Sequence, residues 1–427
     1  MAEKLTRRKM LRKGAQAALV GAVGACAAPA LRGSADEPSR AHTAVKGVDY
    51  YEKLGVTPFI NAAGTYTVLS ASTMPEEVQA AIAIASQKPV NILELHDAAG
   101  AYLAQRLKCQ GALVTAGAAS ALTLGVAACV TAGKENAVLD IPTEMDGLKY
   151  EIIVQKTHRY DYDHALRNCG TKFVEVETMD DYEKAFNDKT VMCHFFNAAE
   201  GGKISRENWI RAAHQHGVPC FNDAAADVPP ISNLWNYTQM GFDLVTFSGG
   251  KGLRGPQCTG LLLGRKDLID AAKLNNSPHS NTVGRGMKVA KEEIVGLVAA
   301  VDWFLKQEDA AMEAEYQKRA DLIGAKVKTV PTVQAQTFIP EVANHVPHLL
   351  ITYDQSRIKI SAKDVMEKLR AGKPRIELNP GTGGAPASAG LPGGSNTIIV
   401  GVWMLQPGED SIVADCLYKT LHEALQP

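Results

Sequence analysis

Between residues 110 and 265, short apolar runs alternate with segments in which apolar positions recur every three or four residues. Short runs rich in valine, isoleucine, leucine and phenylalanine predict buried strands, and the segments between them predict helices. The predicted strands are 112–115, 136–140, 151–155, 172–176, 191–196, 218–221, 244–247 and 260–263. This alternation predicts an α/β fold with a mainly parallel sheet that is covered by helices on both faces.

Helical patterns flank the predicted sheet. In Thr73-Met74-Pro75-Glu76-Glu77, a cap residue, a proline and two acidic residues predict a helix start, with Thr73 as its cap. Residues 289–326 predict one long helix that joins two domains. Beyond it, a smaller α+β domain is predicted from strands at 348–353 and 397–403 and from helices near 361–371 and 409–425.

The chain of 427 residues is long enough for two domains that share a surface. We divide it into an N-terminal signal (1–30), a linker (31–47), a large domain (48–295), a connecting helix (296–326) and a small C-terminal domain (327–427).

The N-terminus has the layout of an export signal. Thr6-Arg7-Arg8-Lys9-Met10-Leu11-Arg12 precedes residues 15–30, which are small, apolar and uncharged, and this layout resembles a twin-arginine signal. We therefore expect a periplasmic protein that is moved by the twin-arginine export machinery. A weak lipobox that ends at Cys26 is the alternative, in which the mature protein is anchored by a lipid.

Composition narrows the partners. The formal net charge of −1 gives no support for a nucleic-acid partner, and no apolar stretch after the signal is long enough to span a bilayer. The cysteines form no Cys-x-x-Cys pair, so no metal site is indicated.

Lys251 is the candidate that carries most of the chemistry. It follows the apolar run 244–247 in Ser248-Gly249-Gly250-Lys251-Gly252, where glycines hold a lysine just past a strand end. Asp223 ends an earlier predicted strand. A lysine amine that forms a Schiff base and an aspartate that keeps a pyridinium nitrogen protonated are what pyridoxal phosphate (PLP) requires. Taken alone, either residue also suits a turn or a helix cap, so the order of the two favours the PLP interpretation.

A phosphate cradle is predicted where the strand 112–115 passes into a helix. Gly117, Ala118 and Ala119 are small enough to let backbone N–H groups and the helix dipole face a phosphate, and Ser120 or Ser248 would add a hydroxyl. Close packing of helix on sheet is the alternative explanation for these small residues.

Two further polar residues follow predicted strands. His158 follows the strand 151–155 and would stack on the pyridine ring, and Asn197 follows the strand 191–196 and would donate to the cofactor's phenolic oxygen. A capping or surface histidine and a turn asparagine are the respective alternatives.

Several stretches together resemble fold-type-I PLP enzymes of the group related to selenocysteine synthase and D-glucosaminate-6-phosphate ammonia-lyase. The stretches are 60–65, 94–96, 114–120, 158–159, 221–223, 247–257 and 284–293. The resemblance extends from about residue 50 to residue 425 and implies a seven-stranded, mainly parallel sheet with a smaller C-terminal domain. It also implies a homodimer or a larger homo-oligomer.

The resemblance also implies residue roles. Lys251 is the Schiff-base lysine and Asp223 the pyridinium partner, whereas Arg285 and Lys288 form an anion-binding pair that reaches a neighbouring subunit's site. Asn61, Thr65 and Arg159 are candidates for substrate or anion binding. Arg375 is a further candidate for a substrate carboxylate, with a solvated surface arginine as the alternative.

The expected function is that of an exported PLP-dependent lyase or transferase that acts on an amino acid or amino-sugar acid through an external aldimine. The resemblance favours α,β-elimination with release of ammonia, in which the freed Lys251 acts as general base and acid. A selenocysteine-synthase-like transferase, a racemase and an aminotransferase would use the same residues. A non-catalytic binding protein with the same fold is the remaining alternative.

Overall fold

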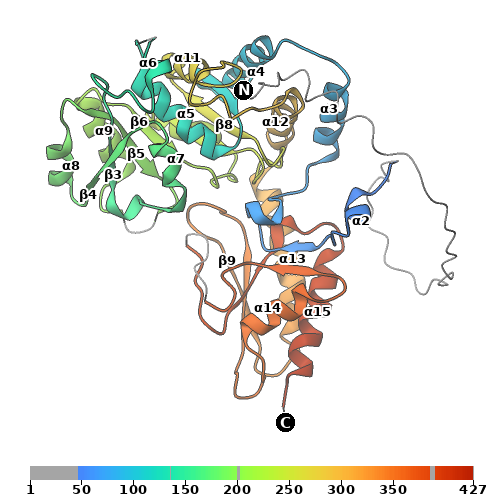
Figure 1. Ribbon diagram of the computed structural model, residues 1–427. Helices are drawn as coiled ribbons and strands as arrows, with labels where there is room; N and C mark the ends of the chain where they lie inside the picture. The colour runs from blue at the N-terminus through green and yellow to red at the C-terminus, as the bar shows by residue number, and fades with distance from the viewer. Residues whose placement is uncertain (1–46, 135, 200–201, 385–389, 427) are drawn as a thin grey trace, which may run out of the picture. The chain divides into compact units, whose positions relative to one another are not determined.

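The seven strands of the large domain form one sheet (Figure 1). The computed structural model describes residues 47–426 except 135, 200–201 and 385–389. The order in the sheet is β2-β8-β7-β6-β5-β3-β4. β8 is antiparallel to β2 and β7, and the other neighbours are parallel, so the predicted mainly parallel sheet is confirmed. The strands are β2 (Gly111–Thr115), β3 (Glu151–Gln155), β4 (Lys172–Val176), β5 (Thr190–Phe196), β6 (Cys220–Asp223), β7 (Leu244–Ser248) and β8 (Gly260–Gly264).

Helices cover both faces of this sheet because its strands, apart from the edge strand β4, are apolar on both sides. Leu113 of β2 packs in one hydrophobic cluster, whereas its neighbours Ala112 and Val114 pack in another, as the alternation of side chains along a strand requires. The first cluster lies under α5 (Ala118–Thr131), α7 (His164–Arg167) and α11 (Lys266–Asn275). The second lies under α4 (Ile92–Arg106), α8 (Met179–Ala185), α9 (Arg206–Gln215), α10 (Asn233–Met240) and α12 (Lys291–Phe304).

Two of the predicted elements are wrong. The expected strand 136–140 is the short helix α6 (Ala137–Asp140), in which Leu139 is 60% exposed and so joins no core. The expected long helix 289–326 is broken into α12 and α13 (Asp309–Val327). The break falls at extended Glu308, and the Asp309 carboxylate that follows accepts hydrogen bonds from the Ile231 N–H at 3.0 and 3.2 Å.

Thr73 is not the cap of the first long helix. Helix α3 (Glu76–Ser86) begins after Pro75, and no side chain caps it. Thr73 instead accepts hydrogen bonds from Arg254 through its carbonyl at 2.9 Å and its hydroxyl at 3.0 Å. The remaining short helices are α2 (Tyr50–Leu54) and the 3-10 turns η1 (Thr67–Leu69), η2 (Lys156–His158), η3 (Asp161–Asp163) and η4 (Val402–Met404).

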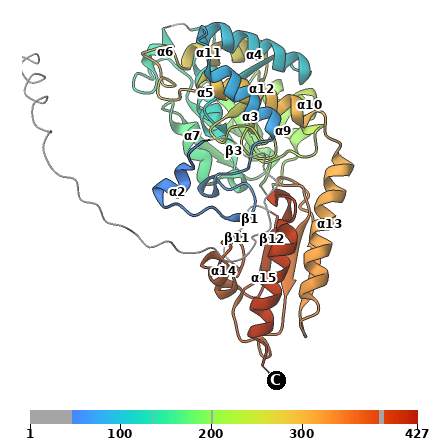
Figure 2. The ribbon, with the colours of Figure 1, turned by 90° about the vertical axis from the view of Figure 1, so that its right-hand side faces the viewer.

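The small domain has an antiparallel sheet of three strands in the order β12-β10-β9. Figure 2 shows α13 and α15 side by side along this domain. A separate parallel pair joins β1, which comes early in the chain, to β11, and Ile60 and Ala62 of β1 pack in the small domain's core. The structure thus places part of the stretch 48–295 with the small domain. The elements are β1 (Ile60–Ala62), β9 (Gln334–Phe338), β10 (His348–Thr352), β11 (Ile376–Leu378), β12 (Ile398–Gly401), α14 (Ala362–Arg370) and α15 (Glu409–Glu423).

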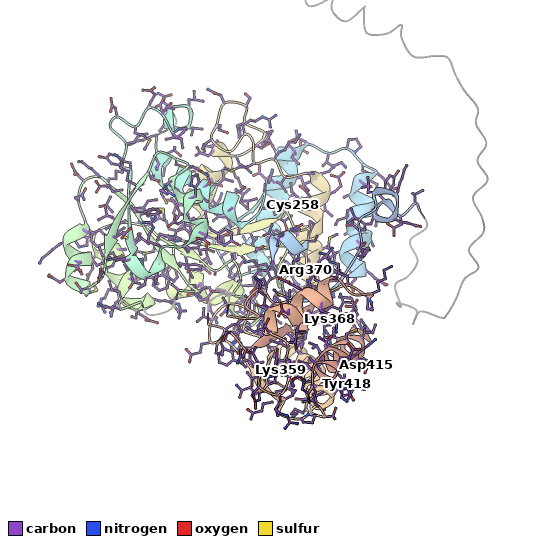
Figure 3. The ribbon with its side chains drawn as sticks, turned by 60° about the horizontal axis from the view of Figure 1, so that its bottom comes forward. Cys258, Lys359, Lys368, Arg370, Asp415 and Tyr418 are labelled. Atoms are coloured by element: carbon purple, nitrogen blue, oxygen red, sulfur yellow. The ribbon has the colours of Figure 1, made fainter. Side chains whose placement is uncertain are left out.

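Ion pairs on the outside of the small domain tie its helices together, and Figure 3 labels several of their members. Lys326 of α13 lies 2.9 Å from Asp415 of α15 and also sits over the ring of Tyr418. Lys368 of α14 lies 2.8 Å from Glu423. These residues are exposed, so the pairs contribute little to stability and leave the core to hold the domain.

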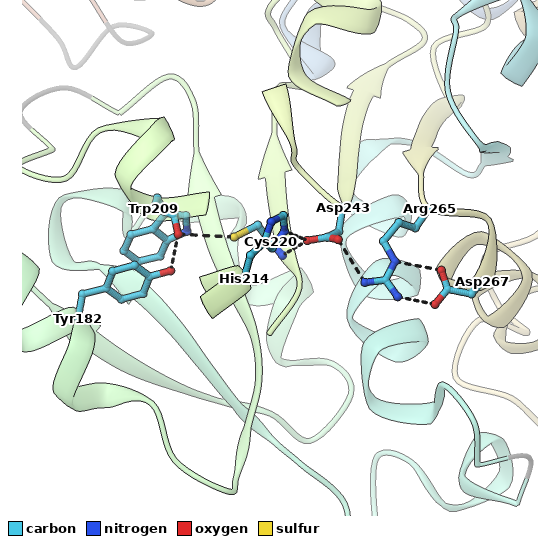
Figure 4. A network of polar contacts seen from close by, with 7 residues as sticks. All are labelled: Tyr182, Trp209, His214, Cys220, Asp243, Arg265 and Asp267. Carbon is cyan, nitrogen blue, oxygen red and sulfur yellow. Dashed lines mark hydrogen bonds and ion pairs between the residues drawn. The ribbon is translucent and has the colours of Figure 1, made fainter. Parts of the chain in front are cut away.

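At the amino ends of β6 and β7, a buried aspartate organises a polar network (Figure 4). Asp243 is 7% exposed and accepts hydrogen bonds from the Cys220 N–H at 2.7 Å and from His214 at 2.9 Å. Its other oxygen accepts from Arg265 at 3.2 Å, and Arg265 also pairs with Asp267. Asp243 therefore satisfies a buried backbone donor at the edge of the sheet opposite Asp223.

Among the described residues, no helix combines the length and the apolar character that crossing a membrane requires.

Replacing Asp243 tests the network. Asp243→Ala leaves the buried Cys220 N–H without its acceptor, which costs about 1–3 kcal/mol of unfolding free energy and lowers the urea midpoint. Asp267→Ala is the control because Asp267 is 59% exposed and its loss should cost less than about 0.5 kcal/mol. Equal midpoints for the two variants would contradict this account.

Candidate active site

The carboxyl ends of β2, β6 and β7 open into one cavity of about 510 Å³. Because these strands point the same way, the turns that follow Thr115, Asp223 and Ser248 meet at one edge of the sheet. The small domain closes the other side. The residues that line the cavity from there or from the entry segment include Thr65, Tyr66, Asn344, His348, Asn379 and Trp403.

Lys251 enters this cavity on a loop that only glycine permits. A Cβ atom at Gly249 would lie 2.1 Å from the Thr259 hydroxyl, and one at Gly252 would lie 2.0 Å from the Val228 carbonyl oxygen. The loop is also fixed by the hydrogen bond from the Arg254 N–H to the Lys251 carbonyl at 2.9 Å. Burial lowers the pKa of the Lys251 ammonium, and the charges of Asp223 and Asp227 oppose that shift. The loop thus presents a lysine that loses its proton more readily than a solvated one.

Asp223 ends β6 and lies buried at the floor of the cavity. One carboxylate oxygen accepts a hydrogen bond from the Tyr160 hydroxyl, and the other accepts from the Ala225 N–H at 3.0 Å. Burial raises the pKa of Asp223, whereas these hydrogen bonds and the charge of Lys251 lower it. The Tyr160 ring also stacks on Phe196 at 3.9 Å, so the two rings form an aromatic wall of the cavity.

A second carboxylate, Asp227, lies four residues beyond Asp223 and also lines the cavity. One of its oxygens accepts hydrogen bonds from the Asn197 amide and from the Tyr237 hydroxyl. The other oxygen is buried and has no partner in the described part of the chain. Burial raises the pKa of Asp227 to about 6, although the hydrogen bond from Asn197 favours the charged form.

The turn between β2 and α5 has the properties of an anion cradle. Gly117 has a φ of 89° and precedes a helix that has neither a side-chain cap nor an acidic residue in its first turn. A Cβ atom at Gly260 of β8 would lie 2.3 Å from the Gly117 carbonyl carbon, so the close approach of β8 requires glycine. Gly117, Ala118 and Ala119 line the cavity. The Gly117 N–H donates to the Thr115 carbonyl at 2.9 Å, whereas the start of the helix leaves the N–H groups of Ala118 and Ala119 available for an anion.

Three of the predicted cofactor contacts need correction. The Ser120 hydroxyl donates to the Ala116 carbonyl at 2.7 Å and is not part of the cavity lining, whereas Ser248 lines it. His158 also lies outside the lining, because its ring packs edge-on against Phe195 and its Nδ1 accepts from the Phe196 N–H at 3.2 Å.

Asn197 is fully engaged elsewhere. Its amide N–H groups donate to Asp227 and to Tyr237, and its oxygen accepts from Arg206. It therefore acts on the cavity through Asp227 and has no donor left for a cofactor oxygen.

Most of the predicted anion-binding residues lie outside the cavity lining. The Arg159 guanidinium pairs with Asp163 and Glu175, and Arg375 pairs with buried Glu377, so both charges are already compensated. Arg285 and Lys288 are exposed and do not line the cavity.

Asn61 and Thr65 belong to the entry segment that borders the cavity. Thr65 lines it directly. Asn61 fixes the turn that precedes Thr65, because its side-chain oxygen accepts hydrogen bonds from the N–H groups of Ala63 and Gly64 at 3.1 Å.

These residues fit PLP. The cavity joins a buried lysine of lowered pKa, a buried carboxylate and a helix N-terminus with free N–H groups, which match the cofactor's aldehyde, ring nitrogen and phosphate. The aromatic wall of Tyr160 and Phe196 offers a flat surface, the role that the sequence assigned to His158.

Sequence reasoning missed several lining residues. Asp227 and Tyr160 carry a local signal, because they follow strand ends within four residues of Asp223 and two residues of His158. Asn344, His348 and Trp403 carry none, since they reach the cavity only through the packing of the small domain.

The chain is similar to several known proteins. Residues 171–371 match the family model of class-V aminotransferases. The 5'-C-glycyluridine monooxygenase-decarboxylase of a Streptomyces species is 29% identical over 77% of this chain and 83% of its own. The D-glucosaminate-6-phosphate ammonia lyase of Salmonella typhimurium is 27% identical over 76% of this chain and 87% of its own. A solved structure of D-glucosaminate-6-phosphate ammonia-lyase has a TM-score of 0.75 and 24% identity, and covers 88% of this chain and 99% of its own.

Asp227 should impose a pH dependence on stability in the cofactor-free protein. Its folded pKa of about 6 exceeds its ordinary value of 3.8, so the stabilisation that protonation provides is complete below pH 3.8 and is lost as the pH rises through 6. In the wild-type protein, the unfolding free energy measured with urea should fall between pH 4 and 7, and Asp227 should account for a fall on the order of 2 kcal/mol. Asp227→Asn should lack that part of the fall. Asp188→Asn, at an exposed position, is the control and should keep the wild-type slope. An unchanged slope in Asp227→Asn would rule out this role.

Proposed function

We propose that this chain is a fold-type-I PLP-dependent enzyme, and that it is a lyase that releases ammonia from a small amino substrate by α,β-elimination. The observation that carries the proposal is the meeting of Lys251 and Asp223 in one cavity beside the free N-terminus of α5. The similarity to an ammonia lyase over three quarters of the chain favours elimination among the reactions open to such a site.

PLP supplies an electron sink that stabilises negative charge at the α-carbon of an amino substrate. Asp223 would hold the proton on the ring nitrogen, and Tyr160 keeps that carboxylate oriented by donating to it. Ala118 and Ala119 would bind the phosphate through their N–H groups, and Gly117 would leave room for it beside them.

Lys251 is the group that moves protons. Its lowered pKa lets Nζ act as the base that takes the proton from the substrate's α-carbon, and the same Nζ can return a proton to the group that leaves the β-carbon. Asp227 adds a second negative charge near this lysine and limits how far its pKa falls.

A monooxygenase-decarboxylase among the relatives favours a second candidate, which is oxidative decarboxylation of an amino acid substrate. The products separate the two reactions: elimination yields ammonia and a keto acid without oxygen uptake, whereas decarboxylation with oxygen yields carbon dioxide and consumes oxygen.

Replacing Lys251 tests the proposed function. The purified protein should show a near-visible band that borohydride reduces, with the label on the peptide that carries Lys251. Lys251→Ala should lose the reducible band and lower ammonia release by about 10²–10⁴-fold or more. Lys266→Ala, an exposed lysine paired with Asp270, is the control and should behave as wild type. Retained turnover in Lys251→Ala would sink this mechanism.

We also propose that the protein is exported through the twin-arginine route, on the strength of Arg7-Arg8 and the apolar residues that follow. The signal lies outside the described residues. A selenocysteine-synthase-like transferase would instead need a cytoplasmic location, because its substrate is a charged tRNA.

Fractionation of the producing cells distinguishes these locations. The wild-type chain should appear in the periplasm at reduced length, whereas the double variant Arg7→Lys, Arg8→Lys should stay in the cytoplasm at full length, because it keeps the charge and lacks the arginine pair. Lys13→Arg is the matched control. Membrane retention that disappears in Cys26→Ala would establish the lipid-anchored form, and a full-length cytoplasmic wild type would overturn export.

A homodimer or larger homo-oligomer is part of the proposal. Arg285 and Lys288 are exposed, and Lys251 is the only Lys or Arg among the described residues that line the cavity. A neighbouring subunit that presents this pair would place positive charge near the cofactor phosphate.

A further inference from the structure

The small-domain side of the cavity carries polar atoms with no partner in the protein. The indole N–H of Trp403 and the side-chain oxygen of Asn344 are buried and make no hydrogen bond within the described chain. Both residues line the cavity, as does His348. Unpaired buried polar atoms cost free energy unless a ligand or water satisfies them, so this wall is suited to a polar ligand.

The indole N–H of Trp403 lies beside a glycine. Gly64 has a φ of 122°, and a Cβ atom there would lie 3.5 Å from Trp403 Nε1. Trp403 itself is 3% exposed, in the turn η4 that follows β12. Because an indole nitrogen only donates, this position requires an oxygen acceptor from a ligand.

His348 offers the complementary group. Its Nδ1 lies 2.8 Å from the Val346 carbonyl oxygen, to which it must donate, so the neutral ring carries an acceptor at Nε2. Burial lowers the pKa of His348 to about 4, which keeps the ring neutral near pH 7. His348 pairs with Gly401 across β10 and β12, so the sheet holds it two residues from Trp403.

Asn344 is held in place by an unusual backbone. Ala343 and Asn344 have φ values of 54° and 49°, which residues other than glycine adopt at a cost of about 1–3 kcal/mol each. The Asn344 N–H donates to the Ala226 carbonyl of the large domain at 2.7 Å, and both Asn344 and Asp227 line the cavity. The free oxygen of Asp227 is a further acceptor at this place.

The charge of the lining excludes an anion from this wall. Asp161, Asp223 and Asp227 line the cavity, and Lys251 is the only Lys or Arg among its described lining residues. A phosphate or second carboxylate at the wall would meet acceptors and negative charge, whereas a hydroxyl can donate to His348 or Asn344 and accept from Trp403.

We propose that Asn344, His348 and Trp403 form a hydroxyl-binding subsite, which selects amino substrates whose end remote from the amine is neutral and hydroxylated. This inference rests on the proposed function, since it assigns the substrate class of the same cavity. Lys251 and Asp223 would act at the amine end, and the subsite would hold the rest of the substrate.

Calorimetric titration of the borohydride-reduced holoenzyme tests the subsite without turnover. The probes are D-glucosaminate, its 6-phosphate and D-2-aminohexanoate, which share the amine and carboxylate and differ in their remote end. D-glucosaminate should bind most tightly. Trp403→Phe and His348→Phe should each weaken it by about three- to tenfold, the effect of one neutral hydrogen bond, and leave D-2-aminohexanoate within about twofold.

His345→Phe is the matched control, because His345 is an exposed histidine of the same segment that does not line the cavity. It should leave all three affinities unchanged. Tighter binding of the 6-phosphate, equal losses for both remaining probes in the variants, or no binding of D-glucosaminate would each overturn the subsite. In each of those cases the borohydride label on Lys251 would still be found, so the proposed function would stand. A protein that takes up no PLP would contradict the proposed function. The same titrations on the unmodified protein would then still test the subsite.

Discussion

The site depends on the electrostatic balance between one buried lysine and two buried carboxylates. Burial disfavours the charged form of each group, so it lowers the pKa of Lys251 and raises those of Asp223 and Asp227. Their mutual attraction works against both shifts. Hydrogen bonds from Tyr160 to Asp223 and from Asn197 to Asp227 favour the carboxylates further. Lys251 can therefore lose its proton in the low-dielectric cavity, while the two carboxylates still stabilise its charged form.

That balance exists because the backbone brings the three groups to one edge of the sheet. Parallel β6 and β7 end at Asp223 and Ser248, and the glycines that follow Ser248 pack too closely against Thr259 and Val228 to accept a side chain. The opposite edge is held by Asp243, which is buried among backbone and cationic donors. Asp243 and Asp227 are both buried carboxylates, but both oxygens of Asp243 accept hydrogen bonds, whereas one oxygen of Asp227 has no partner in the described part of the chain. The carboxylate with a free oxygen is the one that lines the cavity.

The sequence predicted the elements whose signal is local. The strands of the large sheet follow from short apolar runs, which are buried on both faces except in the edge strand β4, and Lys251 follows from glycines at a strand end. The predicted strand 136–140 was wrong because a run of three apolar residues does not reveal whether it reaches the core, and Leu139 does not. His158 was chosen as the flat ring of the site, but Tyr160 is the one that lines the cavity, because spacing along the chain cannot tell which of two neighbouring rings turns toward it. Asn344, His348 and Trp403 depend on packing between distant segments, which no local pattern encodes.

The two sides of the cavity differ in a way that bears on substrate choice. The large domain contributes charge and the groups that suit a cofactor, whereas the small domain contributes neutral donors and acceptors from β10, η4 and the strained segment at Ala343 and Asn344. An arginine at such a wall would attract a substrate anion. Arg375 does not serve there, because its charge is compensated by buried Glu377 within the small domain. Neutral groups discriminate by hydrogen-bond geometry, because an unmet donor or acceptor penalises a substrate that lacks the matching hydroxyl. The neutral wall of the small domain therefore bears on which molecules fit the cavity, whereas Lys251 and Asp223 line it from the large domain.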